Sequence, residues 1–466
     1  MFAINPAAPG VPPAPGAPGT PGAPAAKVDP SMFQITPQAG VAPAGAVPVG
    51  PGGVPPAVQV GGLSMGAYGE IKFGSLRNPD AGGRWQSGFD AARFVLLPTY
   101  AITPNIIFNA EIEFEHAGIA FDNDDKLHGT AEIEQMYIDF KIHQNFNWRA
   151  PGIDLVPVGH INLYHEPTLF YSVHRPELAN GIVPTTWRTP STSFYGDIFE
   201  GWKYQIQASF SIEDFGDSFD KRTDANRVAD GTYDGGINGK QALGLSRPVL
   251  GDFRQLSNTI AWAGRVSFQP PQVPGLAGSA STYWSPNVTP RGAHASICDP
   301  SIPDSCELID GGHLGHNSMT MLNTEFRYRR PETNWEFRGE AVYIRFSNPE
   351  NLRANNDGDD SNNVGKTMWG ASGEIAYHHN LGTILESQWE LVPFYRYTRE
   401  NLQTSGFAGL DANNPTGAGQ LQFHTFGAAL FPSPKAVLKL NYQKVIDKEP
   451  GGAKRDTILG GVGIFF

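Results

Sequence analysis

The sequence predicts an all-β protein, a transmembrane antiparallel β-barrel of sixteen strands, with fourteen or eighteen as the alternatives. Three observations predict this fold class. Many stretches alternate apolar and polar residues over about 10 to 13 positions, whereas ordinary strands average about 5 or 6. Short connections alternate with long polar ones along the chain. The last residue is Phe466, in "TILGGVGIFF". Strands of this length suit a tilted crossing of a bilayer.

The composition excludes several classes of protein. Gly (54) and Pro (39) make up about a fifth of the 466 residues and charged residues only 17%, which is unusual for a soluble enzyme. The net charge of −12 argues against a nucleic-acid partner. The sequence contains no run of about 18 apolar residues, so no membrane helix is predicted. "MFAINPAAPG" has no features of a signal peptide, so the numbering begins at a processed end or the export signal is left out.

The chain divides into two parts by composition. Residues 1–58 are a low-complexity arm of Pro, Ala and Gly, which is expected to be disordered or semi-rigid and periplasmic. The alternative is an arm that spans the cell wall or contacts a periplasmic partner. Residues 59–466 form the predicted barrel domain.

A two-residue period identifies the strands. In "IIFNAEIEFEH" the residues Ile106, Phe108 and Ile112 take one face, while Glu111 and Glu113 take the other, and a helix would mix these faces. Fifteen strands are read directly, near 63–73, 89–100, 106–116, 130–142, 155–165, 200–211, 258–268, 275–284, 321–330, 334–346, 367–379, 383–399, 420–431, 435–446 and 456–466.

The connections supply the sixteenth strand. The short ones, "AITPN", "PPQVPG", "RPET", "HNLG" and "FPSP", are the predicted periplasmic turns. Strand directions were alternated from the N-terminus and from the C-terminus. The two assignments agree only if a further strand, about Ser193 to Phe199, descends to a tight turn at Glu200 and Gly201. This gives sixteen strands and eight external loops. The alternative is a soluble sandwich or propeller. The strand lengths, the alternation of connections and the terminal Phe argue against it.

The polar faces of the strands are expected to line the interior. Sixteen strands enclose more space than side chains fill, so a water-filled lumen is predicted unless it is plugged. Individually these residues could be ordinary solvated or ion-paired wall residues, but together they predict a pore of mixed charge. The candidates are Lys72, Arg93, Glu111, Glu113, Glu115, Asp139, Lys141, Lys203, Arg265, Glu325, Arg327, Arg329, Arg396 and Lys439.

The third external loop, residues 166–192, is unusually rich in apolar and aromatic residues. Folding inward against the barrel wall would bury these residues and narrow the lumen. The alternative is an external flap over the mouth. The candidate constriction residues are His174, Arg175, Glu177, Trp187 and Arg188.

The stretch from "HINLYHEPTLFYSVHRPELANGIVPTTWR" to "SFYGDIFEGWKYQIQASF", with the strand count and the terminal Phe, resembles the phosphate-selective (type O/P) porins of Gram-negative outer membranes. The resemblance implies a trimeric sixteen-strand channel with an inward third loop, and Phe466 as a membrane-insertion signal. The phosphate-selective members use a ladder of arginines and a lysine cluster. Here the whole protein is acidic, with a net charge of −12, so a cation-preferring or weakly selective pore is expected instead.

Other motifs carry weaker hypotheses. Cys298 and Cys306, in a loop, are expected to form a disulfide, with two free thiols as the alternative. The acidic stretches 122–125 and 355–363 could bind Ca²⁺, but solvated loops are the simpler interpretation, and otherwise no cofactor or metal is expected. His313 and His316 have no metal-site spacing, and "HExxH", "GxSxG" and "GxGxxG" after a strand are absent, so an enzyme is not expected.

These observations predict a passive diffusion channel in the bacterial outer membrane, with lipid and small ions or polar solutes as partners. A second hypothesis is a scaffold barrel that anchors the envelope or sheaths a partner protein such as an electron carrier. A third is an adhesin or receptor that uses the loops at 213–257 and 285–317.

Overall fold

The computed structural model describes residues 62–78, 82–116, 130–211, 259–288, 316–330, 332–348, 366–404, 420–448 and 455–466. The predicted arm, the two cysteines, the two acidic stretches and nearly all of the long polar loops lie outside these ranges. Within them, no helix is long and apolar enough to cross a membrane.

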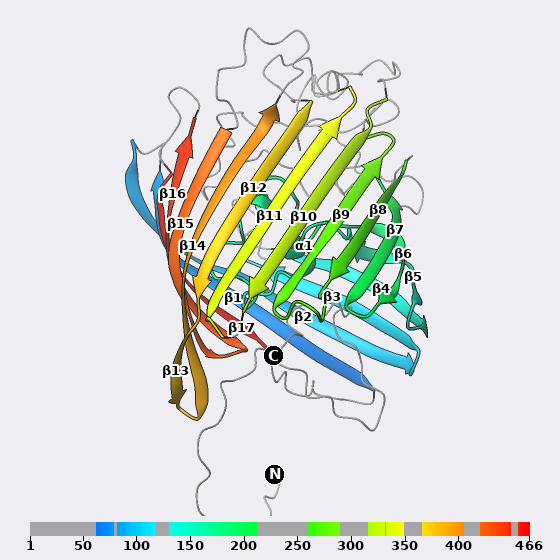
Figure 1. The fold of residues 1–466 in the computed structure, drawn as a ribbon, viewed down its shortest axis with the longest axis horizontal. Helices are drawn as coiled ribbons and strands as arrows, with labels where there is room; N and C mark the ends of the chain where they lie inside the picture. The colour runs from blue at the N-terminus through cyan, green and yellow to red at the C-terminus, as the bar shows by residue number, and fades with distance from the viewer. Residues whose placement is uncertain are drawn as a thin grey trace, which may run out of the picture.

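The described chain forms one antiparallel sheet with two single-turn helices (Figure 1). The strands are β1 (Leu63–Asn78), β2 (Arg84–Thr103), β3 (Ile106–Glu115), β4 (Thr130–His143), β5 (Phe146–Leu155), β6 (Arg188–Phe199), β7 (Trp202–Phe210), β8 (Ile260–Phe268), β9 (Leu276–Ser285), β10 (Met319–Arg329), β11 (Trp335–Phe346), β12 (Thr367–Tyr377), β13 (His379–Ile384), β14 (Ser387–Thr404), β15 (Gln420–Ser433), β16 (Ala436–Asp447) and β17 (Thr457–Phe465). The helices are α1 (His160–Leu163) and α2 (Leu178–Gly181).

The sheet closes on itself as a barrel. Each strand pairs with its sequence neighbours, and β1 also pairs with β17, from Tyr68 opposite Phe465 to Leu76 opposite Thr457. β12 and β13 both pair with β14 and are interrupted only at His378, so the 17 strand segments make sixteen staves. The predicted sixteen-strand barrel is therefore confirmed, and an open sandwich is excluded.

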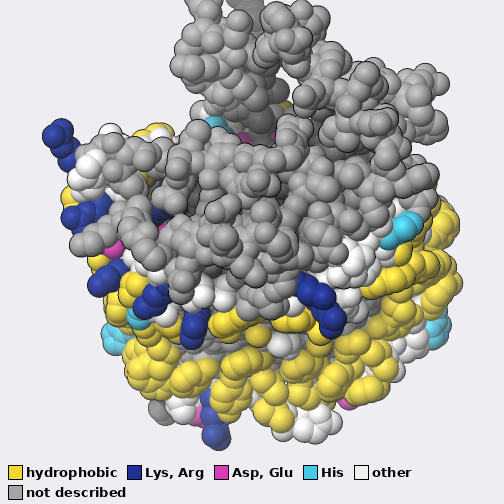
Figure 2. All heavy atoms as spheres, turned by 90° about the horizontal axis from the view of Figure 1, so that it is seen from above, with side chains coloured by type: hydrophobic (Ala, Val, Ile, Leu, Met, Phe, Trp, Pro, Cys, Tyr) yellow, Lys and Arg dark blue, Asp and Glu magenta, His cyan; other side chains and the backbone are white. Residues whose placement is uncertain are grey.

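The two faces of the wall have opposite chemistry. Along β10, Leu322 and Phe326 are about half exposed, while Asn323, Glu325 and Arg327 are buried on the inside. Figure 2 shows hydrophobic side chains covering much of the visible outer wall. A contiguous apolar surface of this size does not remain in water in a monomeric soluble protein. The outer wall is therefore suited to lipid.

Aromatic pairs gather at the end of the barrel that carries the short turns. Phe146 stacks on Phe194 at 5.4 Å between ring centroids, Phe199 contacts Trp202 at 5.4 Å, and Trp335 contacts Tyr377 at 4.9 Å. Tyr and Trp rings favour the boundary between hydrocarbon and water, where one edge is apolar and the other wet. These pairs mark one boundary of the apolar band.

The C-terminal strand completes the seam between β1 and β17. The backbone of Phe466 exchanges two hydrogen bonds with Ala67, of 2.6 and 2.8 Å. Ile458, Val462 and Ile464 face outward with Phe466, as the alternation in "TILGGVGIFF" indicates. The chain therefore ends inside a hydrogen-bonded ladder, which explains why its last residues are apolar.

Two sequence-based assignments were wrong. No strand spans 155–165: the fifth strand is β5, and the alternation in "LVPVGHINL" reflects packing inside the barrel, where Pro157 cannot donate to a ladder. "HNLG" is not a turn but belongs to β13. Leu385 and Glu386 make that turn with φ of 50° and 62°, at the tip of a hairpin that projects beyond the barrel (Figure 1).

The predicted sixteenth strand is confirmed and is longer than expected. β6 begins at Arg188 rather than about Ser193 and runs to Phe199, before a turn at Glu200 and Gly201. Gly201 adopts φ 77°, and a Cβ there would lie 2.4 Å from the backbone oxygen of Gln269. Glycine satisfies both constraints of this turn.

Candidate functional site

Residues 156–187, between β5 and β6, fold into the barrel and are called the inner segment below. Hydrogen bonds join it to distant parts of the wall. Tyr171 donates its hydroxyl to Glu336 on β11 (3.0 Å), the backbone N–H of Val173 donates to Asn441 Oδ1 on β16 (2.7 Å), and that of His160 donates to Glu325 on β10 (2.5 Å). The segment therefore lies across the interior and is not a flap over the mouth.

The boundaries of this segment differ from the predicted loop of 166–192. It starts ten residues earlier, at Val156, because β5 ends at Leu155, and it ends at Trp187 because β6 starts at Arg188. The sequence from Thr189 to Thr192 is wall, not loop. The missed signal is the Pro157 and Gly159 pair, which is incompatible with a central strand.

The first residues of the inner segment and its C-terminal half pack together in an apolar core against the wall. Val156, Val158, Leu178, Ile182, Val183 and Trp187 are almost fully buried in it. Their partners on the wall stand near the long-loop ends of the strands and include Tyr283, Met319, Met321, Ile344, Phe346 and Phe423. The interior is thus apolar toward the long loops, which the polar pattern of the strands did not predict.

Glu177 joins the C-terminal half of the segment to strands β14, β15 and β16 by hydrogen bonds. Arg396 on β14 donates from Nε to Glu177 Oε2 (2.8 Å) and from Nη2 to Oε1 (3.0 Å). The hydroxyls of Thr398 and Thr425 and the amide of Gln443 complete the shell at 2.7, 3.0 and 2.8 Å. Burial alone would raise the pKa of Glu177, but the Arg396 guanidinium outweighs it and holds that pKa below its usual value.

The other predicted constriction residues have different surroundings. Arg175 is buried and its Nε and Nη2 atoms have no hydrogen-bond partner among the described residues. Burial lowers the pKa of its guanidinium, and Arg93 lowers it further. The ring of Trp187 packs 4.7 Å from that of Tyr283 in the apolar core, so it lines no passage. His174 is partly exposed.

Arg188 lies at the start of β6 rather than in the inner segment. Its guanidinium forms ion pairs with Glu132 and with Glu134, the latter at 3.3 Å. It therefore belongs to the charged wall.

The fourteen predicted pore-lining residues all lie on the inward faces of their strands. Most form ion pairs with neighbours in the wall. The pairs are Lys72 and Arg93 with Glu70, Arg93 with Glu113, Lys141 with Asp139, Lys203 with Asp197, Arg265 with Glu325, Arg327 with Glu336, Arg329 with Glu390, and Arg396 with Glu374. Lys439 donates instead to the backbone oxygen of Ser172 in the inner segment (2.9 Å).

Sequence reasoning missed several inward partners. Glu134, Glu336 and Glu374 are buried in this network, and the partly buried Arg338 pairs with Glu336 and lies 4.3 Å from the centre of the Tyr171 ring. The signal was available for three of them, because Glu336 and Arg338 continue the two-residue period of β11 and Glu374 that of β12.

Two cavities lie beside the inner segment on the side of the short turns. One, of about 160 Å³, is lined by residues that include His160, Lys203, Arg265 and Glu340. The other, of about 220 Å³, is lined by residues that include Lys141, Arg149, Tyr195 and Lys203. Burial lowers the pKa of His160 to about 4, so its imidazole is neutral at pH 7. The charged half of the interior thus holds open volume.

Comparisons with known proteins give the following likenesses. No family model matches the chain. An uncharacterized protein of Aquifex aeolicus (strain VF5) is 27% identical over 387 residues, which cover 82% of this chain and 75% of that protein.

Among solved structures, the outer membrane channel DcaP of Acinetobacter baumannii has a TM-score of 0.49 at 10% identity and covers 88% of this chain and 100% of that one. Salmonella typhi OmpF has 0.48 at 9%, covering 87% and 98%. The anion-selective porin of Comamonas acidovorans has 0.47 at 12%, covering 87% and 100%. The chain is thus similar to several Gram-negative outer-membrane porins. At these scores the likenesses add nothing to the fold that the strand pairing establishes.

We expect Glu177→Gln to loosen the inner segment. At pH 7 the amide leaves Arg396 without its bidentate partner, and the free energy of unfolding should fall by about 3 kcal/mol. Because the pKa of Glu177 is lowered in the fold, its contribution is complete above the pKa of the unfolded chain and is lost as pH falls through the folded value. Urea unfolding in detergent at pH 7 and in acid should therefore show a gap between wild type and variant that closes in acid. A gap independent of pH would contradict this.

We expect Gly463→Val to displace the N-terminal half of the inner segment. A Cβ at Gly463 would lie 2.5 Å from Cβ of Pro167 and 3.0 Å from Cγ1 of Val437. The overpacking should cost about 1–3 kcal/mol. Gly373→Val is the matched control, since a Cβ there meets nothing within 4 Å. Equal urea midpoints for the two variants would show that the segment does not rest on β17.

Proposed function

We propose that this barrel is a porin of the bacterial outer membrane, a channel for passive diffusion of ions and small polar solutes. The observation that carries the proposal is the reversal of chemistry across one closed wall, apolar outside and charged inside. Charged side chains in a barrel interior are favourable only if water or counter-charges meet them. Here ion pairs supply counter-charges, and cavities of about 160 and 220 Å³ adjoin charged side chains of the wall.

The inner segment is the proposed constriction. It crosses the interior, and its residues His160, Tyr164 and Pro176 line one cavity together with Arg396 on the wall. Solutes would pass beside it, between paired charges, without a covalent step. We propose no catalytic role.

We propose that the pore prefers cations weakly. Glu340 lines the same cavity as Arg265 and Arg396 and forms no ion pair with any described residue, while both arginines are paired. The resemblance to phosphate-selective porins does not extend to a free arginine ladder, because Arg265, Arg327 and Arg396 each contact a carboxylate. A guanidinium committed to a carboxylate has little capacity left for phosphate.

The environment of the chain follows from the same proposal. The apolar band and its aromatic boundary would lie in lipid, with the short turns in the periplasm, and the porin resemblance implies a homotrimer. Residues 1–58 would then be a periplasmic arm ahead of the barrel domain of 59–466.

A scaffold barrel is the second candidate, and one observation favours it. An apolar core lies between the inner segment and the long-loop ends of strands β8 to β12, β15 and β16. A closed barrel could anchor the envelope without conducting. Planar-bilayer recordings separate the two candidates, because a purified trimer or monomer that gives no conductance steps is not an open channel.

We expect Glu340→Gln to reduce the cation preference of the channel. At pH 9, where the Glu340 carboxyl group is ionised, removing its charge lowers the local concentration of cations, so the cation-to-anion permeability ratio should fall about twofold. Reversal potentials in a KCl gradient at pH 9 measure this ratio. Glu386→Gln, in the exposed hairpin turn, is the matched control and should leave it unchanged. A Glu340→Gln variant with the wild-type ratio would refute the assignment of selectivity to this carboxylate.

A further inference from the structure

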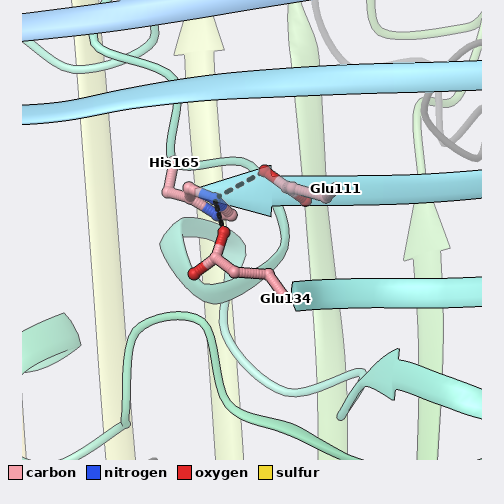
Figure 3. Close-up of side chains that lie close together, drawn as sticks. All are labelled: Glu111, Glu134 and His165. Carbon is pink, nitrogen blue, oxygen red and sulfur yellow. Dashed lines mark ion pairs between the residues drawn. The ribbon is translucent and has the colours of Figure 1, made fainter. Parts of the chain in front are cut away.

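Three buried side chains converge where the inner segment meets the wall (Figure 3). His165 comes from the inner segment, Glu111 from β3 and Glu134 from β4. One potential ligand atom from each lies within 4.8 Å of the other two. The exposed fractions of the three side chains are 2%, 1% and 0%. The cluster is thus shielded from solvent.

The hydrogen bond at the other side of the ring fixes which nitrogen of His165 faces the carboxylates. Nδ1 lies 3.3 Å from the backbone oxygen of Asn162, which can only accept, so Nδ1 carries the hydrogen. Nε2 then faces Glu111 and Glu134 with a lone pair when the ring is neutral. Lone pairs from three ligand atoms directed at one point repel one another unless a cation lies between them.

The distances in the cluster are too long for hydrogen bonds. Nε2 of His165 lies 3.5 Å from Oε1 of Glu111 and 3.6 Å from Oε2 of Glu134. A charge-assisted N–H···O bond would measure about 2.7–2.9 Å, and a single proton would select one carboxylate. Neither Nε2 nor Glu134 Oε2 has a hydrogen-bond partner among the described residues.

The same distances fit a coordinated metal ion. Ligands about 2.1 Å from a tetrahedral Zn²⁺ stand about 3.4 Å apart along each edge. The distances of 3.5 and 3.6 Å from Nε2 to the two carboxylate oxygens therefore match two such edges, and the two oxygens lie within 4.8 Å of each other. One His and two Glu ligands leave a position for water, and this donor set suits Zn²⁺ and similar divalent transition metals.

The surrounding side chains orient the ligands as outer-shell groups do in metal sites. Tyr68 donates its hydroxyl to Glu111 Oε1 (3.0 Å), and Gln135 donates to Glu111 Oε2. Arg188 donates to Glu134 Oε1 (3.3 Å), the oxygen that does not face His165. Glu111 receives only these neutral donors and has no Lys or Arg within ion-pair distance in the described part of the chain. The negative charge of Glu111 therefore favours a cation at the centre of the cluster.

We propose that Glu111, Glu134 and His165 bind one divalent transition-metal ion that ties the inner segment to β3 and β4. The ion would fix the N-terminal half of the segment, as Glu177 and Arg396 fix the C-terminal half. Metal binding can be measured whether or not the barrel conducts, so its failure and that of the channel are distinguishable.

Zn²⁺ retention by the full chain tests the proposal. Wild type, His165→Gln and Glu134→Gln are folded in detergent with Zn²⁺ and dialysed against metal-free buffer, and bound zinc is counted by atomic emission. Wild type should retain one equivalent more than either variant, with an affinity at least about 100-fold higher by chelator competition. Sites elsewhere on the chain remain in every variant and cancel in the difference.

His378→Gln is the matched control. His378 is also buried between two carboxylates, but its Nδ1 meets Glu390 at 2.9 Å and its Nε2 meets Glu336 at 3.2 Å, so hydrogen bonds satisfy both nitrogens. This variant should retain zinc like wild type. Equal zinc in wild type and His165→Gln would overturn the proposal and assign the cluster to an imidazolium.

A measurement on wild type alone covers the case in which the variants do not fold. Co²⁺ in place of Zn²⁺ should give the intense visible d–d bands of a four-coordinate site. Only the weak bands of six-coordinate Co²⁺ would contradict a buried site made by these three ligands.

Discussion

Every feature of this molecule depends on the closure of one sheet. A strand that leaves its edge unpaired exposes a row of backbone donors and acceptors, and no water satisfies them in hydrocarbon. The pairing of β1 with β17 removes both edges at once. Only then does the wall separate two environments, so that one alternation of side chains can present Leu322 and Phe326 to lipid and Glu325 and Arg327 to the interior.

The sequence was sufficient for the wall because a strand of a membrane barrel repeats one simple pattern many times. The sixteen staves, the turn at Gly201 and the inward faces of residues such as Arg265 and Glu325 all follow from it. The same pattern failed at 155–165, because this stretch alternates apolar residues as a strand does but lies inside the barrel, where residues 155–159 are all buried. Pro157 was the residue that separated the two cases.

The candidate site was less predictable, because it depends on contacts between residues far apart in the sequence. Glu177 could be proposed from its loop, but nothing local indicates that Arg396, Thr425 and Gln443 surround it. Likewise Glu111 was identified as an inward residue, whereas its proximity to Glu134 and His165 required the fold of the inner segment. The two-residue period predicts which face of a strand a residue occupies, but it does not predict which residue lies across the interior from it.

The glycines of the last strand link two events in the assembly of the barrel. Gly461 and Gly463 on β17 lie against Val173 and Pro167 of the inner segment, and β17 also pairs with β1 to close the barrel. The final residues of the chain therefore finish the wall and the seat of the segment together. A chain that lacks β17 would therefore lose the contacts with Val173 and Pro167 of the inner segment together with the seam.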